Sequence, residues 1–242
     1  MRAAMLSTNP IAPRERLMFA LDVADPAAAR ALAERLGDSV KFYKLGLELA
    51  MAPGYFDLID WFTARGCKVF ADLKFYDIPA TVQAAVRQVA KRGATYCTIH
   101  ANRPIVEAAA AAKGELKLLA VTVLTSFDQS DVDELGLGVE VAPLVLERAK
   151  RAQAAGADGI VSSGHEVERL RAALGPALIM VTPGIRPGGV AGGDDQKRVM
   201  SAEQAFRAGA DHIVVGRPIR DAADPRAAAE AIQSTIASLF PG

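Results

Sequence analysis

The sequence predicts an α/β protein of the (β/α)8 type, a TIM barrel, folded as one domain over residues 1–242. Short apolar runs typical of buried strands alternate with alanine-rich segments that have helical patterning, which indicates a parallel sheet with helical crossovers. Four times an alanine-rich stretch ends at a glycine directly before an apolar run, at 64–72, 91–100, 154–163 and 207–216. Glycine is favoured where a helix closes and the chain turns. The length of 242 residues also fits, because such barrels take about 250 residues.

Each element of the predicted barrel has a place in the chain. The eight predicted strands are Leu17–Asp22, Val40–Leu45, Cys67–Leu73, Thr95–His100, Lys117–Val123, Gly159–Ser162, Leu178–Val181 and His212–Val215. The predicted helices are Pro26–Leu36, Gly54–Ala64, Thr81–Arg92, Arg103–Ala112, Val139–Ala155, Glu166–Leu174, Ala202–Ala208 and Asp224–Leu239. Residues 1–13 are predicted to form a loose tail.

A doubly wound open sheet is the alternative architecture for such a strand–helix alternation. It usually has fewer strands, and it often carries a glycine fingerprint after the first strand. The segment LDVADPAAA (21–29) has no such fingerprint. Several predicted strands, such as LKLLAVTV (116–123), are apolar almost throughout, as expected of parallel strands buried on both faces. The barrel is therefore the better interpretation.

Composition and charge exclude several classes of protein. Hydrophobic residues make up 51% of the chain and charged residues 23%, which favours a globular core over disorder. Lys+Arg and Asp+Glu both number 28, so the zero net charge argues against a general nucleic-acid or membrane-surface binder. We expect a cytoplasmic protein, since the start does not resemble a signal peptide and no apolar run approaches the roughly 20 residues of a membrane span. Cys67 and Cys97 lie in apolar runs typical of reduced, buried thiols.

Charged residues gather where predicted strands end, which is where barrels of this type carry their active sites. Asp22 ends the first strand, Lys44 lies near the end of the second, and Asp72 and Lys74 lie at the end of the third. Side chains two residues apart on a strand share a face, so Lys44, Asp72 and Lys74 are expected to converge at the rim. With Asp77 beyond, the alternating charges would neutralise one another. The alternative is a set of ordinary ion pairs at strand ends, each contributing little when exposed.

Polar residues near the other predicted strands point less clearly to a functional role. Thr125 and Ser126 follow the fifth strand, where they fit either a ligand contact or a local turn. His212 begins the eighth strand and is expected to be structural, and His165 is expected to face solvent. The histidines and cysteines show no zinc-binding spacing, so no metal is predicted.

The segment DLKFYDIPAT (72–81) resembles the pattern D-x-K-x-x-D-I-P-x-T of the orotidine 5'-phosphate decarboxylase family. A D-x-K alone would be weak, but the ten-residue segment is specific, and further resemblances follow in order along nearly the whole chain. They are LDVAD (21–25), YKLGLEL (43–49), VTVLTS (121–126), VTPGIRP (181–187) and VVGRPI (214–219). After His100 the chain reads NRP instead of a more glycine-rich turn, so the role of His100 stays open.

The resemblance implies a carboxy-lyase that converts orotidine 5'-monophosphate to UMP without a cofactor, the last step of de novo pyrimidine nucleotide biosynthesis. By family position, the Lys74 ammonium stabilises the carbanion at C6 of the pyrimidine and then donates the proton. Asp72 would keep Lys74 charged and aimed, and Lys44 would complete the charge network.

The resemblance also implies a homodimer in which three residues reach the neighbouring subunit's site, namely Asp77, Ile78 and Thr81. Asp22 would contact the ribose hydroxyls and Thr125 the pyrimidine edge.

The substrate phosphate requires cationic and N–H donors away from C6, commonly from the loops after strands seven and eight. In this sequence those loops carry Arg186, Gln196, Gly216 and Arg217. Pro183, in the segment VTPGIRP, is also expected to bind the substrate. The glycine-rich loop 183–196 is either a lid that closes on the phosphate or a flexible surface loop.

Two other functions are compatible with a barrel of this kind. One is a related sugar-phosphate decarboxylase or aldolase on the same barrel that depends on Mg²⁺, against which the DIPAT segment (77–81) argues. The other is a non-catalytic binder of phosphorylated ligands, against which the retained proton donor Lys74 argues.

Overall fold

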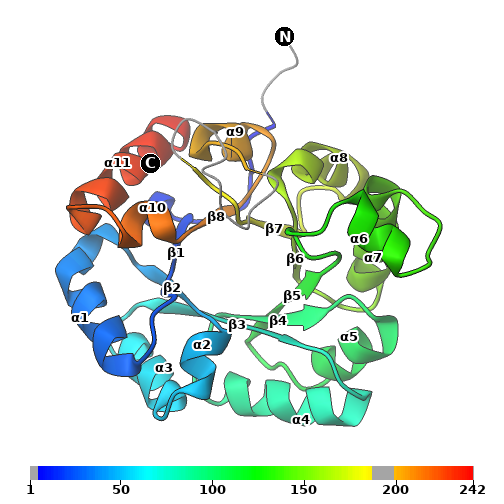
Figure 1. Cartoon of the computed structure of the whole chain (residues 1–242), viewed down its shortest axis with the longest axis horizontal. Coiled ribbons are helices and arrows are strands. Elements are labelled where there is room, and N and C mark those ends of the chain that lie inside the picture. Colours follow the sequence, from blue (N-terminus) through cyan, green and yellow to red (C-terminus); the bar gives the residue numbers. More distant parts are fainter. Residues whose placement is uncertain (1–4, 187–198, 242) are drawn as a thin grey trace.

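A computed structural model describes residues 5–186 and 199–241 of the chain. Eight parallel strands close into a barrel in sequence order, and Figure 1 shows the helices in a ring outside them. The fold class predicted from the sequence is confirmed. The strands are β1 (Leu17–Ala20), β2 (Phe42–Leu45), β3 (Lys68–Phe75), β4 (Tyr96–His100), β5 (Lys117–Val121), β6 (Gly159–Val161), β7 (Ile179–Thr182) and β8 (His212–Val215).

The eight predicted helices are all present, and none of their ends differs from the prediction by more than two residues. They are α1 (Pro26–Leu36), α3 (Tyr55–Thr63), α4 (Pro79–Ala90), α5 (Arg103–Ala110), α7 (Val141–Ala154), α8 (Gly164–Leu174), α9 (Ala202–Arg207) and α11 (Pro225–Leu239). Local chemistry explains such ends: the Asp25 side chain accepts hydrogen bonds from the first backbone N–H groups of α1, and Pro26 takes the first helical position.

Five short helices in the described ranges were not predicted; each has at most six residues, which leaves little room for a helical pattern to show in the sequence. They are α2 (Leu47–Met51), α6 (Gln129–Glu134), α10 (Arg217–Arg220) and the 3₁₀ turns η1 (Pro13–Glu15) and η2 (Gly37–Ser39). Three of them, α2, α6 and α10, follow strands β2, β5 and β8, so they lie in the loops that surround the candidate site.

Strand alternation separates two hydrophobic cores. The larger lies between the strands and the helices, and the smaller fills the barrel interior. The interior is lined by large side chains, among them Met18, Phe42, Phe70, Tyr96, Leu119, Val181 and Val214. His212 lies among them: its Nε2 is 3.0 Å from the Tyr96 hydroxyl and its Nδ1 is 2.9 Å from the Glu15 carbonyl oxygen. Burial lowers the pKa of His212 to about 4, so the ring is neutral and structural, as the sequence predicted.

The described part of the N-terminal segment is attached to the barrel, which differs from the loose tail expected for residues 1–13. Met5 N–H donates to the Arg207 carbonyl oxygen at 3.0 Å, and Asn9 Nδ2 donates to Asp211 at 2.8 Å. Asp211 directly precedes β8, so these contacts hold the segment at the amino end of the barrel, away from the strand ends that carry the site.

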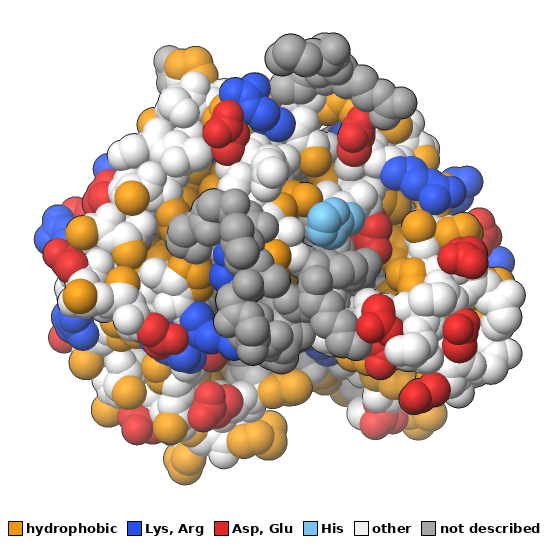
Figure 2. Space-filling view, turned by 45° about the horizontal axis from the view of Figure 1, so that its top comes forward, with side chains coloured by type: hydrophobic (Ala, Val, Ile, Leu, Met, Phe, Trp, Pro, Cys, Tyr) orange, Lys and Arg blue, Asp and Glu red, His pale blue; other side chains and the backbone are white. Residues whose placement is uncertain are grey.

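The surface in view in Figure 2 intersperses acidic and basic side chains. Within the described ranges, none of the helices combines the length and the apolar character needed to cross a membrane.

Candidate active site

A cavity of about 520 Å³ opens at the carboxyl ends of the strands. This volume is in the range of small-molecule sites. Nine of the residues predicted for the site line it: Asp22, Lys44, Asp72, Lys74, Thr125, Pro183, Arg186, Gly216 and Arg217. Ser126, which fitted either a ligand contact or a turn, also lines it. The strand-end rule for barrels is therefore enough to place most of the predicted set around one space.

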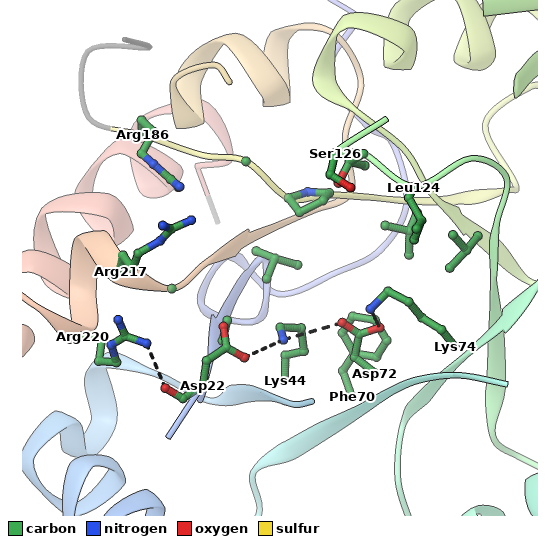
Figure 3. Close-up of a pocket in the computed structure, with 18 of the residues that line it drawn as sticks. Asp22, Lys44, Phe70, Asp72, Lys74, Leu124, Ser126, Arg186, Arg217 and Arg220 are labelled. Carbon is green, nitrogen blue, oxygen red and sulfur yellow. Dashed lines mark hydrogen bonds and ion pairs between the residues drawn. The ribbon is translucent and has the colours of Figure 1, made fainter. Parts of the chain in front are cut away.

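Four charged side chains form a continuous array across the floor of this cavity (Figure 3). Lys44 Nζ lies 3.0 Å from Asp22 Oδ1 and 3.6 Å from Asp72 Oδ2. Lys74 Nζ lies 2.8 Å from Asp72 Oδ1. The side chains of Lys44 and Asp72 are each only 12% exposed, which distinguishes them from ordinary ion pairs at strand ends.

The array keeps its buried members charged. Burial acts to lower the pKa of Lys44, but the carboxylates of Asp72 and Asp22 outweigh it, and the pKa is raised overall. Burial acts to raise the pKa of Asp72, but Lys44 and Lys74, with hydrogen bonds from Lys74 and Thr98, outweigh it, and the pKa is lowered overall. At neutral pH the site therefore presents fixed positive and negative charges.

The backbone at Lys74 is irregular, which corrects the simple alternation argument. Lys74 has φ of 47°, the only positive φ among the described residues other than glycine. The pairing of β3 with β4 shifts between Ala71 and Phe75, so regular two-residue alternation does not hold there. The Lys74 side chain still meets Asp72, but a distorted strand end brings it there.

Sequence reasoning missed Thr98 on β4. Its hydroxyl accepts a hydrogen bond from Lys74 N–H at 2.9 Å and donates one to Asp72 Oδ1 at 2.9 Å. A threonine inside a strand gives no sequence signal for such a role.

Arginines occupy the other end of the cavity. Figure 3 shows Arg186, Arg217 and Arg220 on one side and Lys74 on the opposite side. A guanidinium matches phosphate geometry with paired hydrogen bonds. At Gly216 a Cβ atom would lie 3.3 Å from the Ala20 Cβ, so glycine keeps the chain close to β1 at this end.

Arg220 was also missed by the sequence reasoning. It lines the cavity, and its Nη1 donates to the Asp22 backbone carbonyl oxygen at 2.9 Å. Residues three apart share one face of a helix, so Arg217 and Arg220 lie on one face of α10, but this relation could be used only once α10 was known.

Three predicted residues that the structure describes do not line the cavity of their own chain. Asp77, Ile78 and Thr81 are exposed on the segment that leads from β3 into α4. Gln196, with most of the predicted lid 183–196, lies outside the described residues.

His100, whose role the sequence left open, does not line the cavity either. Its ring lies 4.8 Å from the ring of Tyr76, centroid to centroid. Burial, with Arg148 and Lys74 nearby, lowers the pKa of His100. These contacts indicate a neutral ring that supports the loop after β3.

The acidic groups of the site are engaged with lysines. Within residues 5–186 and 199–241, no group of three or more His, Cys, Asp or Glu side chains is arranged to hold a metal ion. Lys44 lies between Asp22 and Asp72, so the two carboxylates face an ammonium group in place of a shared cation position.

The closed barrel and its lysine–aspartate array define a (β/α)8-barrel enzyme with its site at the carboxyl ends of the strands. Residues 15–232 match the model of the orotidine 5'-phosphate decarboxylase / HUMPS family. The chain belongs to this family.

Individual relatives are similar to this chain over nearly its whole length. An orotidine 5'-phosphate decarboxylase from Methylococcus capsulatus is 55% identical over 97% of both chains. One from Stenotrophomonas maltophilia is 52% identical over 95% of both. The crystal structure of orotidine 5'-phosphate decarboxylase from Lactobacillus acidophilus has a TM-score of 0.81 at 36% identity, and the match covers 92% of this chain and 99% of that one.

Proposed function

We propose that this chain is a carboxy-lyase that converts orotidine 5'-monophosphate to UMP and carbon dioxide in pyrimidine nucleotide biosynthesis. The observation that carries the proposal is the array of lysines and aspartates at the cavity floor, in which Lys74 Nζ lies 2.8 Å from the buried Asp72. Membership of the family and relatives of this name support it. A cytoplasmic location is part of the proposal, since Cys67 and Cys97 are free thiols, as in reducing compartments.

The charges of the cavity suggest how the substrate lies. Its phosphate is expected at the arginine end, near Arg186 and Arg217, because that end offers guanidinium groups. The pyrimidine then extends toward Lys74, and Asp22 and Lys44 are left beside the ribose hydroxyls, to which a carboxylate and an ammonium can hydrogen-bond.

In the proposed reaction, the bond between C6 and the carboxylate breaks and its electron pair stays on C6. The Lys74 ammonium stabilises that negative charge and then transfers a proton to C6, which completes UMP. Asp72 holds the ammonium in place through the 2.8 Å contact. Because the charges are fixed before the substrate arrives, little reorganisation is needed as the carbanion forms.

The Mg²⁺-dependent alternative on the same barrel makes a different demand on the site. It needs carboxylates that are free to coordinate a cation, whereas Asp72 lies against two lysines and Asp22 against one. This donor set favours the metal-independent reaction.

We expect the purified protein to consume orotidine 5'-monophosphate at the same rate with and without excess EDTA. The assay is the change in pyrimidine absorbance, with UMP identified as the product by chromatography. Failure to convert orotidine 5'-monophosphate would contradict the proposed function. Loss of activity in EDTA that added Mg²⁺ restores would favour the alternative.

We further propose that the active form is a homodimer in which Asp77, Ile78 and Thr81 complete the neighbouring site. These residues are exposed in the single chain, although Ile78 is a large apolar residue at 67% exposure. Met51, after the neighbouring strand β2, is 80% exposed. Large apolar side chains exposed after two neighbouring strands support a protein–protein contact at this side of the barrel.

Mixing two inactive variants tests this arrangement. We expect Lys74→Ala and Asp77→Ala homodimers to recover about a quarter of wild-type activity after subunit exchange, since half of the dimers are then mixed and each has one intact site. If Asp77 acted in its own chain, both sites of a mixed dimer would stay defective. No recovery after verified exchange would therefore contradict the shared site.

A further inference from the structure

We propose that Thr98 is a positioning residue whose hydroxyl fixes the backbone of Lys74 and the carboxylate of Asp72 together, and so aims the ammonium into the cavity. Its expected effect on turnover rests on the proposed function. The hydrogen bonds of Thr98, in contrast, are present in the folded chain whatever reaction it catalyses.

The hydroxyl of Thr98 has a complete set of partners. Thr98 is fully buried on β4. Its Oγ1 accepts the Lys74 N–H at 2.9 Å and donates to Asp72 Oδ1 at 2.9 Å. The same carboxylate oxygen receives the Lys74 ammonium at 2.8 Å. The three contacts form a ring that joins the backbone of Lys74 to its own side chain through Thr98 and Asp72.

The need for this ring comes from the distortion of β3. Ala71 pairs with Cys97 and Phe75 with Ile99, so β3 advances four residues where β4 advances two. A bulge of this kind removes regular ladder partners from the bulged strand. The Thr98 hydroxyl provides a side-chain acceptor for Lys74 N–H at that point.

The distortion also places Lys74 in a backbone conformation that a side chain normally avoids. Its φ of 47° lies in the left-handed region, which is unfavourable for a residue other than glycine or asparagine. Such conformations persist when surrounding contacts determine them, and they concentrate at functional sites. The Thr98 hydrogen bond is such a contact, and it acts on the residue that carries the proposed proton donor.

Asp72 depends on the same hydroxyl. Thr98 is one of the groups that favour the ionised form of this buried carboxylate, after the two lysines. Without the hydroxyl, Asp72 loses a donor in a place that is 12% exposed. Both partners of the catalytic ion pair would then be less well fixed.

The matched variants are Thr98→Val, which keeps the shape and removes the hydroxyl, and Thr98→Ser, which keeps the hydroxyl. Thr182→Val is the control, because Thr182 is a fully buried strand residue whose hydroxyl has no partner among the described residues. We expect kcat for orotidine 5'-monophosphate to fall about 100-fold in Thr98→Val, as for a misplacement of about 1 Å. KM should change by less than about threefold, because the arginine end is untouched. Thr98→Ser and Thr182→Val should stay within about fivefold of the wild-type kcat.

A second measurement does not depend on turnover. Hydrogen exchange of the Lys74 amide, followed by NMR on ¹⁵N-labelled protein, reports the bond to Thr98 directly. We expect exchange to be at least about tenfold faster in Thr98→Val and close to wild type in Thr98→Ser. If Thr98→Val does not fold by circular dichroism, Thr98→Ala lacks the same hydroxyl and carries the same expectations.

The outcomes separate the two proposals. An unchanged kcat in Thr98→Val, or an unchanged Lys74 amide, would overturn the role of Thr98 while wild-type turnover still supported the proposed function. An equal loss of kcat in Thr98→Ser and Thr98→Val would also overturn it, since the hydroxyl would then not be the cause. If the wild type fails to convert orotidine 5'-monophosphate, the proposed function fails, and the amide exchange still decides whether Thr98 holds Lys74.

Discussion

Replacing Lys74 with alanine is expected to lower kcat/KM for orotidine 5'-monophosphate by at least about 10⁵-fold, or about 7 kcal/mol of transition-state stabilisation. The substitution removes the positive charge beside C6 and the proton that completes UMP. Asp72 also loses its ion pair with Lys74 and keeps the longer one to Lys44 and the hydrogen bond from Thr98. The measurement is the absorbance decrease of the substrate under saturating and limiting concentrations.

A matched control separates this effect from a general loss of positive charge. Lys41 forms an exposed ion pair with Asp38 at the surface, away from the cavity, so Lys41→Ala should keep nearly full activity. UMP, which lacks the departing carboxylate, should bind Lys74→Ala with little change if the arginine end supplies most of its affinity. A Lys74→Ala protein that folds and retains more than about one hundredth of the wild-type kcat/KM would refute the role of this ammonium.

Replacing Arg217 with alanine is expected to lower kcat/KM for orotidine 5'-monophosphate by about 10²- to 10³-fold, with much less effect on orotidine, which lacks the phosphate. Arg217 lines the cavity at the end opposite Lys74. Binding energy gained at the phosphate can organise the reacting end of the substrate, so the loss should extend to kcat.

The comparison of the two substrates makes this prediction specific. Arg103 forms an exposed pair with Glu107 on α5, and Arg103→Ala should leave both substrates unaffected. Equal losses on the nucleotide and the nucleoside in Arg217→Ala would show that Arg217 supports the fold or the pyrimidine end instead of the phosphate. They would also remove the basis for a lid that closes on the phosphate.

Much of the fold was predictable because its signals are local and repeated. Helix α1 begins and ends at the predicted residues, since Asp25 and Pro26 mark its start and Gly37 follows its end. Strand β8 also has its predicted bounds, because its apolar run follows a glycine-closed helix. The short helix α10 left no periodic pattern, so only its arginines could be noticed in advance.

The site was predictable to the extent that it follows from strand ends. Asp22, Lys44 and Asp72 come from three neighbouring strands, and parallel pairing alone brings their ends together. The left-handed backbone of Lys74 was not predictable, because a bulge in one strand depends on its pairing with the next. The role of Thr98 depends on the same pairing.

The large side chains inside the barrel determine from which side substrate and products can reach the cavity. Phe42, Phe70 and Tyr96 fill the axis beneath the cavity, and Tyr96 is joined to His212 below. In the described part of the chain, the cavity is therefore closed at its inner end and does not continue along the barrel axis to the amino ends of the strands. Under the proposed function, the nucleotide and the carbon dioxide therefore leave on the side of the carboxyl ends of the strands, the side from which the next nucleotide arrives, so product release and substrate binding are consecutive events.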